Sequence, residues 1–301
     1  MQSTALRYFL EVVRTGSIAE ASARLNVAGS AISRQIARLE RELGVALFER
    51  RPRGMVASQA GELLAHHARR TFLDLEHVIL DVRRLQGLKT GTVRVAATEG
   101  FAMDLIPEAV IAFRERYPGI RFDLDVQAPA AVTRKVRDGD VDLGLTFALA
   151  PAPGVRVEIE GRAPIHALMA PNHPLTSREA VTLAELREHP LALPATDTTA
   201  RQLFDIACGL EGIAIEPTLV SNYMAALRAF AEAGGGITIA GRVTVLSRLQ
   251  RSRLAVRPII GAALDQRLFQ IQTMPGRNLP EAVSAFLEHL RTVIRERNVA
   301  S

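Results

Sequence analysis

The chain has 301 residues, a length that suggests about two folding units at roughly 150 residues per domain. Hydrophobic residues make up 48% and charged residues 23%, a globular composition that excludes global disorder and a collagen-like repeat. No apolar run reaches the roughly 18 residues of a membrane span, and the first residues lack the pattern of a secretory signal. A single cysteine, Cys208, excludes an internal disulfide and a multi-cysteine metal site. We therefore expect a cytoplasmic protein with no membrane partner.

The positive charge is concentrated near the N-terminus. The net charge is +5, and arginine supplies almost all of the positive charge because Lys89 and Lys135 are the only lysines. A codon preference for arginine would explain the overall balance but not its distribution. Between residues 24 and 53, seven arginines stand against three acidic residues. Such a local basic excess is typical of a surface that binds a polyanion such as DNA.

Two short helices are predicted at the start of the chain. Apolar residues recur there at helical spacing and indicate an amphipathic first helix: Leu6, Phe9, Leu10 and Val13. Gly16 ends it. Ser17 and Glu20 then have the spacing of a capping box, in which the Ser17 hydroxyl accepts from the Glu20 amide and the Glu20 carboxylate reaches back. This box predicts an alanine-rich second helix that ends near Leu25, with Asn26 in the turn that follows.

A third helix is predicted from Gly29 to about Leu43, with two different faces. One face carries a stripe that we expect to be buried: Ile32, Ile36, Leu39 and Leu43. The other face carries small and basic residues: Ser30, Ser33, Arg34, Ala37, Arg38 and Arg41. Serine allows close approach to the major groove, and Arg34 can donate two hydrogen bonds to guanine O6 and N7. Two helices joined by a short turn, the second of them basic, match a helix-turn-helix.

Residues 47–56 predict a short two-stranded wing with a basic tip, in which 47–50 and 55–56 are strands and 51–54 form the turn. The arginines of the wing would contact phosphates, which adds affinity but little sequence choice. An ordinary solvated helix face is the alternative for the arginines of the third helix. Their place between a capped short helix and a basic wing favours DNA binding. The candidate DNA-binding residues are Ser30, Ser33, Arg34, Gln35, Arg38, Arg50, Arg51 and Arg53.

Residues 1–62 resemble the winged helix-turn-helix of LysR-type transcriptional regulators. The resemblance rests on an ordered set of segments: Leu6–Phe9, Gly16–Ser22, Leu25–Val27, Ala31–Ile36, Leu39–Glu40 and Leu43–Arg50. The chain departs from the family at residues 28–30, where a hydroxyl residue and then a polar residue such as glutamine are usual. Ala28 cannot cap the third helix with its side chain. Gly29 cannot contact a base edge, so we expect base readout to depend on Ser30, Ser33 and Arg34.

A long linker helix is predicted from Ser58, its cap, to about Leu85 or Gly87, roughly 40–45 Å at 1.5 Å per residue. Residues alternately four and three apart along it fit a coiled-coil seam: Leu64, Ala68, Thr71, Leu75, Val78, Val82 and Leu85. The alternative is a single amphipathic helix packed on its own domain. We favour a homodimer, because two DNA-binding domains can then bind two half-sites. We expect no metal at the histidines of this helix, which lack acidic or cysteine partners at ligand spacing: His66, His67 and His77.

Beyond a hinge at residues 87–91, strand and helix patterns alternate. Strands are predicted at 92–97, 121–126, 141–147, 163–169, 191–194, 215–220, 237–240, 254–259 and 266–274. Helices are predicted at 104–117, 130–137, 182–188, 199–209, 223–233, 242–249 and 280–297. The order β-α-β-α-β implies a parallel sheet with helices on both faces, and the pattern restarts after Gly161. We therefore expect an α/β fold with two lobes.

The predicted organisation has three parts. Residues 1–58 form a winged helix-turn-helix DNA-binding domain, and residues 59–90 form the linker (dimerisation) helix and the hinge. Residues 91–301 form an effector-binding domain, with lobe I at about 91–161 and 266–301 and lobe II at about 162–265. This last region resembles the effector domain of LysR-type regulators, which is similar to periplasmic solute-binding proteins.

Ligands of two-lobed α/β folds bind where strands end and helices begin. By the family resemblance, hydroxyl groups across the cleft hold a small inducer, and the role carries over to Thr98, Thr146, Thr196 and Thr198. Glu99 and Phe147 complete the candidate effector site. N-capping alone would explain Thr98 and Thr198, and Glu99 would also complement a helix dipole. Because Glu99 departs from the family towards negative charge, we expect an effector with an amine or another donor.

These observations favour a ligand-responsive transcriptional regulator that binds double-stranded DNA as a dimer, and the resemblance adds a homotetramer. A solute-binding protein would share the cleft but would leave residues 1–62 unexplained and would need a signal peptide. An enzyme is the third alternative, but the chain has no Walker A, Gly-x-Ser-x-Gly or His-Glu-x-x-His motif. Residues 234–236 lack the Lys-Ser/Thr of a phosphate loop, and Cys208 falls in an apolar helix. We expect no enzyme activity and no cofactor, only a small-molecule effector whose identity the sequence leaves open.

Overall fold

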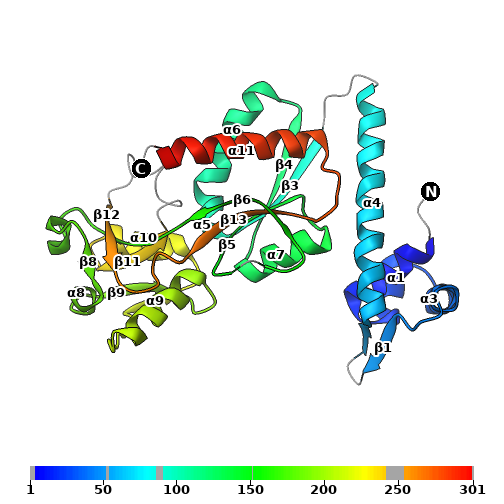
Figure 1. Cartoon of the computed structure of the whole chain (residues 1–301), viewed down its shortest axis with the longest axis horizontal. Helices are drawn as coiled ribbons and strands as arrows, with labels where there is room; N and C mark the ends of the chain where they lie inside the picture. Colours follow the sequence, from blue (N-terminus) through cyan, green and yellow to red (C-terminus); the bar gives the residue numbers. More distant parts are fainter. Residues whose placement is uncertain (1–3, 52–53, 86–90, 151, 242–253, 300–301) are drawn as a thin grey trace. The chain divides into compact units, whose positions relative to one another are not determined.

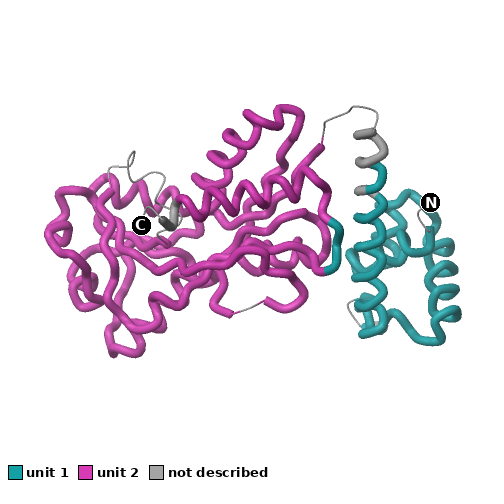
Figure 2. Tube along the Cα trace, turned by 45° about the horizontal axis from the view of Figure 1, so that its top comes forward, with its two compact units in different colours: residues 1–86, 276–278 teal, residues 87–275, 279–301 magenta. Residues whose placement is uncertain are grey.

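The computed structural model describes residues 4–51, 54–85, 91–150, 152–241 and 254–299. The chain divides into two compact units, one of residues 1–86 with 276–278 and one of residues 87–275 with 279–301 (Figure 2). The linker helix, which the sequence suggested as a separate segment, groups with the N-terminal helices. Among the described helices, none combines the length and the apolar character that crossing a membrane requires.

The N-terminal unit consists of helices and a two-stranded wing (Figure 1). Its elements in chain order are α1 (Thr4–Thr15), α2 (Ile18–Leu25), α3 (Gly29–Leu43), β1 (Phe48–Arg51), β2 (Gly54–Ala57) and α4 (Gln59–Leu85). Apolar side chains from all four helices and from the start of the wing meet in one core: Phe9, Val12, Ala21, Ile32, Ile36, Leu47, Phe48 and Ala65. This core confirms the amphipathic patterns predicted for the first and third helices.

The turns between these helices follow the predicted capping chemistry in part. Ser17 Oγ accepts from the Glu20 amide at 3.4 Å, and Asn26 ends α2 in the left-handed conformation at φ 53°. The second half of the predicted capping box is wrong. The Ser17 amide donates to Thr15 Oγ1, and the Glu20 carboxylate pairs with Arg24.

The buried stripe predicted for α3 ends earlier than expected. Its two isoleucines are buried and Leu39 is half-buried, but Leu43 is 51% exposed. Leu43 is the last residue of α3, and Gly44 turns the chain there in the left-handed conformation at φ 70°. Because the helix stops at this point, Leu47 from the following segment completes the core instead.

The predicted wing is confirmed. β1 and β2 pair antiparallel in a register that places Arg51 opposite Gly54. Gly54 has φ 125°, and a Cβ at this position would lie 2.6 Å from the carbonyl oxygen of Gly16, which accepts from the Met55 amide. The wing is therefore attached to the turn between α1 and α2 at a position that requires glycine.

α4 has 27 residues, a length of about 40 Å at 1.5 Å per residue. Ser58 Oγ accepts from the Gly61 amide at 3.1 Å, which confirms the predicted cap. Gly61 is buried, and a Cβ there would collide with the carbonyl oxygen of Leu47. This close contact anchors the start of α4 on its own unit.

The second unit contains two sheets, each covered by helices on both faces (Figure 1). The first sheet has the order β4-β3-β5-β13-β6, built from β3 (Gly91–Ala97), β4 (Ile120–Val126), β5 (Leu143–Ala148), β6 (Arg156–Arg162) and β13 (Leu268–Thr273). On one face of this sheet pack α5 (Glu99–Met103), α6 (Leu105–Arg116) and α11 (Glu281–Val299). The other face is covered by α7 (Pro129–Asp138).

The second sheet has the order β10-β9-β11-β7-β12-β8. Its strands are β7 (Ile165–Met169), β8 (Val181–Thr182), β9 (Leu191–Pro194), β10 (Leu219–Ser221), β11 (Ile237–Gly241) and β12 (Ala255–Ile260). α8 (Leu183–Arg187) and α9 (Thr199–Leu210) pack on one face, and α10 (Met224–Glu232) packs on the other. The two sheets define two lobes, and the chain crosses between them at residues 163–164 and 261–267.

The prediction of parallel sheets holds only for part of each lobe. β3 is parallel to β4 and β5, and β9 is parallel to β10 and β11. β13 runs antiparallel to β5 and β6, and β7 runs antiparallel to β11 and β12, so both sheets are mixed. Each lobe contains a strand that the chain reaches by crossing from the other lobe, and the direction of that strand cannot follow from a local β-α-β pattern.

Other elements also differ from the prediction. The helix expected at 104–117 is confirmed as α6, but an unpredicted short helix, α5, precedes it as a separate element, because Pro107 has no amide and would clash with the fourth residue before it in a continuous helix. The chain therefore breaks at Asp104, which has φ −133°, and Pro107 falls in the first turn of α6. The strand β6 went unpredicted because it lies at a sheet edge with no fully buried side chain. The helix predicted at 242–249 lies outside the described residues.

Candidate functional site

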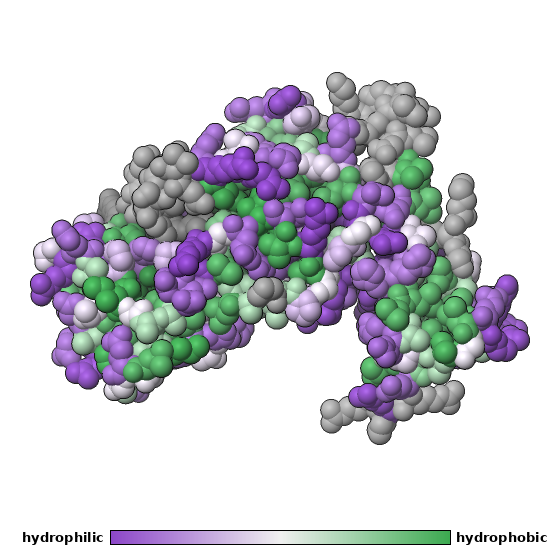
Figure 3. All heavy atoms as spheres, in the orientation of Figure 1, coloured by the Kyte–Doolittle hydropathy of each residue, from purple (hydrophilic) through white to green (hydrophobic). Residues whose placement is uncertain are grey.

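The two faces of α3 lie as the sequence predicted. Ile32 and Ile36 are buried in the core, whereas Ser30, Ser33 and Arg34 are exposed on the opposite side. Figure 3 shows hydrophilic surface along α3, at the right-hand edge of the view. Small hydroxyl side chains beside a guanidinium allow a helix to approach base edges and to donate hydrogen bonds to them. α3 thus has the surface that a DNA-reading helix needs.

The arginines of α3 differ in how they are engaged. Arg38 Nε donates to Glu42 at 2.7 Å, and this hydrogen bond raises the pKa of Arg38 above its ordinary value. Arg41 Nε donates to the Ala37 carbonyl at 3.3 Å. Arg34 forms no hydrogen bond or ion pair with any described residue. Its guanidinium is therefore available for an external partner without first breaking an internal contact.

The first turn of α3 is open. Ala28 is its N-cap residue and makes no side-chain hydrogen bond, as the sequence predicted. A Cβ built on Gly29 would meet the nearest atom, Ile18 Cγ2, at 3.5 Å, which is ordinary contact. Unsatisfied amides at a helix start bind anions such as phosphate. This end of α3 is therefore uncapped, and Ala28 and Ser30 on either side of Gly29 are exposed.

Three of the candidate residues belong to the wing. Arg51 Nη2 donates to Glu49 at 3.0 Å, and both side chains are exposed. Arg50 belongs to β1, and Arg53 lies outside the described residues. Gln35, on α3, is half-buried, so less of its amide is accessible than of its serine neighbours.

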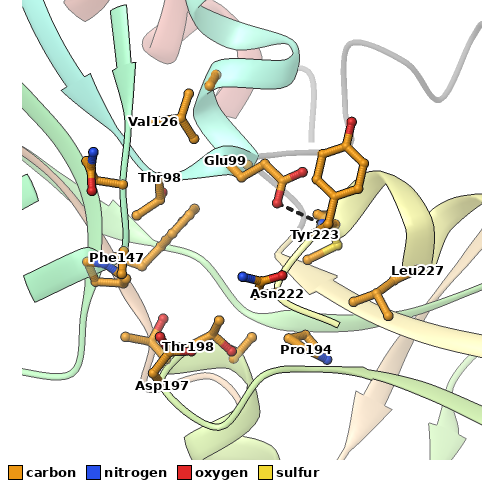
Figure 4. A pocket seen from close by; sticks show the side chains of 18 of the residues that line it. Thr98, Glu99, Val126, Phe147, Pro194, Asp197, Thr198, Asn222, Tyr223 and Leu227 are labelled. Atoms are coloured by element: carbon orange, nitrogen blue, oxygen red, sulfur yellow. Dashed lines mark hydrogen bonds between the residues drawn. The ribbon is translucent and has the colours of Figure 1, made fainter. Parts of the chain in front are cut away.

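A cavity of about 610 Å³ opens in the second unit, where strands of both lobes end. The carboxyl ends of β3, β4 and β5 reach it from the first lobe, and those of β9 and β10 reach it from the second. Figure 4 shows Thr98 and Glu99 on one side of the cavity and Asp197 and Thr198 on the other. This edge of an α/β sheet is where ligands bind, and the volume suits a small molecule.

The cavity includes some of the predicted effector residues but not all of them. Those that line it are Thr98, Glu99, Phe147 and Thr198. Thr146 is buried in β5 and is not part of the lining, because successive side chains of a strand point to opposite faces and Phe147 takes the cavity side. Thr196 is exposed in the loop after β9, and the lining on this loop comes from Asp197 and Thr198 instead.

The two threonines at helix starts differ in their hydrogen bonding. Thr198 caps α9: its Oγ1 accepts from the Arg201 amide at 3.3 Å and donates to the Ala195 carbonyl at 2.8 Å. Thr98 precedes α5 but makes no side-chain cap, and its buried Oγ1 has no hydrogen-bond partner in the described part of the chain. Capping accounts for Thr198, whereas the Thr98 hydroxyl is free to bind a ligand.

Glu99 is engaged within the protein. Its carboxylate accepts from the Met224 amide at 2.7 Å and from the Ala225 amide at 3.4 Å, which are the first amides of α10 (Figure 4). An anion at a helix N-terminus is stabilised by the free amides and the helix dipole. The expectation that Glu99 selects an effector with an amine is therefore not supported, because α10 already compensates its charge.

Arg267, which no sequence pattern indicated as a site residue, lies on the crossing between the lobes just before β13. The side chain is only 7% exposed and lines the cavity. Its guanidinium carbon lies 3.6 Å from the ring centroid of Phe147, and Nε donates to Thr199 Oγ1 at 2.9 Å. Burial lowers the pKa of Arg267 to about 9, so the group remains a cation at neutral pH. The only feature of the sequence that could have indicated Arg267 is its position directly before an apolar strand.

A second buried arginine joins the two lobes beside the cavity. Arg228 of α10 lies 3.6 Å from Asp104, at the corner between α5 and α6, and both side chains are buried. Together with the bonds from Glu99 to the start of α10, this ion pair fixes α10 of the second lobe against α5 of the first.

Comparison with known proteins agrees with this two-part arrangement. Residues 3–62 match the family model of the bacterial regulatory helix-turn-helix protein, lysR family, and residues 86–295 match the LysR substrate binding domain. The chain is similar to the transcriptional dual regulator GltC of Bacillus subtilis, with 32% identity over 79% of this chain and 80% of GltC. It is also similar to a RuBisCO operon transcriptional regulator of Allochromatium vinosum, with 27% identity over 94% of this chain and 93% of the relative.

Among solved structures, a full-length OxyR variant from Pseudomonas aeruginosa covers 97% of this chain and 95% of its own, with a TM-score of 0.67 and 20% identity. At this identity the likeness concerns the fold. The family models together cover most of the chain, and they place the helix-turn-helix on α1–α3 and the ligand domain around the cavity. The chain therefore belongs to the LysR family of bacterial transcriptional regulators.

Proposed function

We propose that this regulator inserts α3 into the major groove of promoter DNA and responds to a small molecule bound in the cavity of its second unit. The observation that supports this most directly is the orientation of α3, with its isoleucines in the core and Ser30, Ser33 and Arg34 exposed. Arg34 supplies base recognition, and the uncapped start of α3 together with Arg50, Arg51 and Arg53 of the wing segment supplies phosphate contacts.

The proposal includes a homodimer formed through α4. The first part of the predicted seam is used within the chain, since Leu64 packs against the N-terminal core and Ala68 is buried. Further along, Val78 is 55% exposed, and apolar residues at this spacing fit a second helix. A dimer brings two copies of α3 to two half-sites, which gives a small domain enough specificity. Pairing of dimers into a tetramer is the corresponding proposal for the second unit.

The effector occupies the cavity in this proposal, in contact with Thr98, Phe147, Thr198 and Arg267. The buried Thr98 hydroxyl without a partner supports this role. The cavity lies between the ends of strands from both lobes. A bound effector therefore shifts the equilibrium between different arrangements of the two lobes. This shift changes how the subunits pair on DNA. No catalytic step is part of the function. Cys208 is buried, and burial raises the pKa of its thiol to about 11, which opposes a role as a nucleophile.

DNA binding is tested by selection from a pool of randomised duplexes with the full-length protein, followed by footprinting of the enriched sequence. We expect two related half-sites separated by one helical turn or a multiple of it, and affinity that falls steeply with salt. A protein that ignores every duplex at low ionic strength would contradict the proposal.

A further inference from the structure

Arg267 is a buried cation with no counter-ion among the residues that the structure describes. Among the described residues, its guanidinium makes one hydrogen bond, to the neutral hydroxyl of Thr199, and stacks on the neutral ring of Phe147. Its Nη1 is buried with no hydrogen-bond partner. Proteins almost always pair a buried charge, because desolvation without compensation is costly. An anion bound beside Arg267 would compensate this charge.

The acidic residues near Arg267 do not supply that anion. Glu99 lines the same cavity, but its carboxylate binds the first amides of α10. Asp104 is buried and paired with Arg228. Asp197 also lines the cavity but is exposed, where solvent and salt screen its charge.

Two further groups favour an anion beside Arg267. The Thr199 hydroxyl that accepts from Arg267 belongs to the first residue of α9, a helix of 12 residues, so the guanidinium lies at the positive end of that helix dipole. The Thr98 hydroxyl, buried in the cavity wall, has no partner and can donate to an oxygen. A guanidinium, a helix start and a free hydroxyl form the donor set that a carboxylate prefers.

The rest of the cavity wall is largely apolar, with contributions from Met103, Val126, Pro194 and Leu227. We infer that the effector is a small organic acid whose carboxylate pairs with Arg267 and whose hydrocarbon part lies against these side chains. This inference rests on the proposed function, because it specifies the chemistry of the same cavity. Arg267 touches Phe147 of the first lobe and Thr199 of the second, so an acid bound to it contacts both lobes at their crossing.

The test is binding to the full-length protein in the absence of DNA, measured by thermal shift and calorimetry. The probes are four carboxylates with their matched neutral amides: acetate, isovalerate, benzoate and phenylacetate. Benzylamine, inorganic phosphate and sulfate complete the set. We expect at least one carboxylate to raise the melting temperature by several degrees, with no shift from its amide. A flat response to every carboxylate overturns the inference, as does a response to benzylamine, to an amide or to inorganic anions alone.

Variants connect the response to Arg267. Arg267→Met should weaken binding of the responding carboxylate by roughly 30-fold or more, since the pairing cation is removed from a buried site. Arg267→Lys keeps the charge and should retain part of the affinity. The control is Arg162→Met, which removes an arginine that is 74% exposed and paired with Asp265 outside the cavity. It should leave carboxylate binding unchanged.

A purely structural role for Arg267 has a different signature. If the guanidinium only held the lobes together, Arg267→Met would lower the melting temperature of the unliganded protein and leave the carboxylate-induced shift in place. That result overturns the inference. We expect the unliganded variant to melt at an equal or higher temperature, because an unpaired buried charge has been removed. Since binding is measured without DNA, failure of the carboxylates leaves the duplex selection to decide the proposed function separately.

Discussion

Two arginines show how surroundings determine what the same side chain can do. Arg34 is exposed and unengaged within the described part of the chain, and its long side chain is free to search for a base edge. Arg267 is held by Phe147 and Thr199 in one geometry, so it can bind only what enters the cavity. Arg34 therefore suits DNA, in which it must select one base pair among many, and Arg267 suits a single small anion.

Arg34 should make the base-specific contact of α3. We expect Arg34→Ala to weaken binding to the selected site by about 1–3 kcal/mol and to relax the preference at one base pair. Arg51→Ala, on the wing, is the comparison, because loss of a phosphate contact lowers affinity evenly across sequences. Quantitative gel shifts on a set of single-base variants distinguish the two. An Arg34→Ala protein that keeps its full discrimination would mean that another face of the unit contacts the bases.

Cys208 should be unreactive while the protein is folded. It is 7% exposed, and burial, with Asp205 and Glu211 nearby, raises the pKa of its thiol to about 11 from an ordinary 9.0. The thiolate fraction at pH 8 is then about a hundredfold lower than for an ordinary thiol. We expect alkylation by iodoacetamide to be slow, to accelerate as the pH rises towards 11, and to become rapid on unfolding in urea. Fast alkylation of the native protein at pH 7 would contradict this account.

At the level of single elements, α3 shows a compromise between stability and access. α2, α8 and α9 begin with a side-chain cap, from Ser17, Thr182 and Thr198 respectively. α3 begins at Ala28 with none, as do α5, α6, α7 and α10 in the second unit. The helix that should contact DNA therefore keeps its first amides open, and an external anion can complete them.

The missing cap predicts a stabilising substitution. Ala28 already has the extended backbone of an N-cap residue, with φ −64° and ψ 133°, so a serine there can bond the first-turn amides. We expect Ala28→Ser to stabilise the N-terminal unit by about 1 kcal/mol, and Ser17→Ala, which removes an existing cap, to destabilise it by a similar amount. Calorimetry of the full chain measures both. Equal melting temperatures for all three proteins would show that capping does not limit stability here.

α4 carries a prediction about assembly. Val78 lies on the predicted seam and is 55% exposed, so Val78→Glu should place a charge in the interface and shift the protein towards monomers. Leu63 is more exposed, at 70%, but lies off the seam, and Leu63→Glu should leave the assembly intact. Analytical ultracentrifugation over a range of concentrations compares them. Dissociation by Leu63→Glu alone would place the interface on another face of α4.

For the whole molecule, the parts that could be predicted from sequence are those fixed by local chemistry. The cap at Ser17, the turn at Asn26, the wing pairing and the two faces of α3 each depend on a few neighbouring residues. The same holds for Thr98 and Thr198, which follow strands and precede helices. Local patterns of this kind are set by hydrophobic period and hydrogen-bond geometry, which the sequence carries directly.

The parts that could not be predicted depend on contacts between distant segments. Arg267 becomes a cavity residue only because the crossing at 261–267 passes between Phe147 and Thr199. The hydrogen bonds of Glu99 could not be predicted, because the start of α10 lies more than a hundred residues further along the chain. Thr146 and Phe147 are neighbours in sequence, and only the sheet decides which of them faces the ligand. The residues that line the cavity, and so the chemistry of its ligand, could therefore be identified only from the folded structure.

The ion pair between Asp104 and Arg228 gives a test of how the two lobes are held together. Both side chains are buried, and removal of either one takes away the opposite charge that lies 3.6 Å from the other. We expect Arg228→Met and Asp104→Asn each to lower the free energy of unfolding of the second unit by about 3–5 kcal/mol. The double variant should lose clearly less than the sum of the two, since the attraction between the two charges is lost only once.

Chemical denaturation of the four proteins gives the coupling energy directly, with Arg201→Met as a control for the loss of an ion pair with an exposed partner within α9. Additive losses would mean that the two side chains act independently and that α10 is held to α5 by Glu99 and apolar packing alone. A strong coupling would mean that this pair holds α10 of the second lobe to the first lobe beside the cavity. A bound effector would then have to change the arrangement of the lobes without breaking this contact.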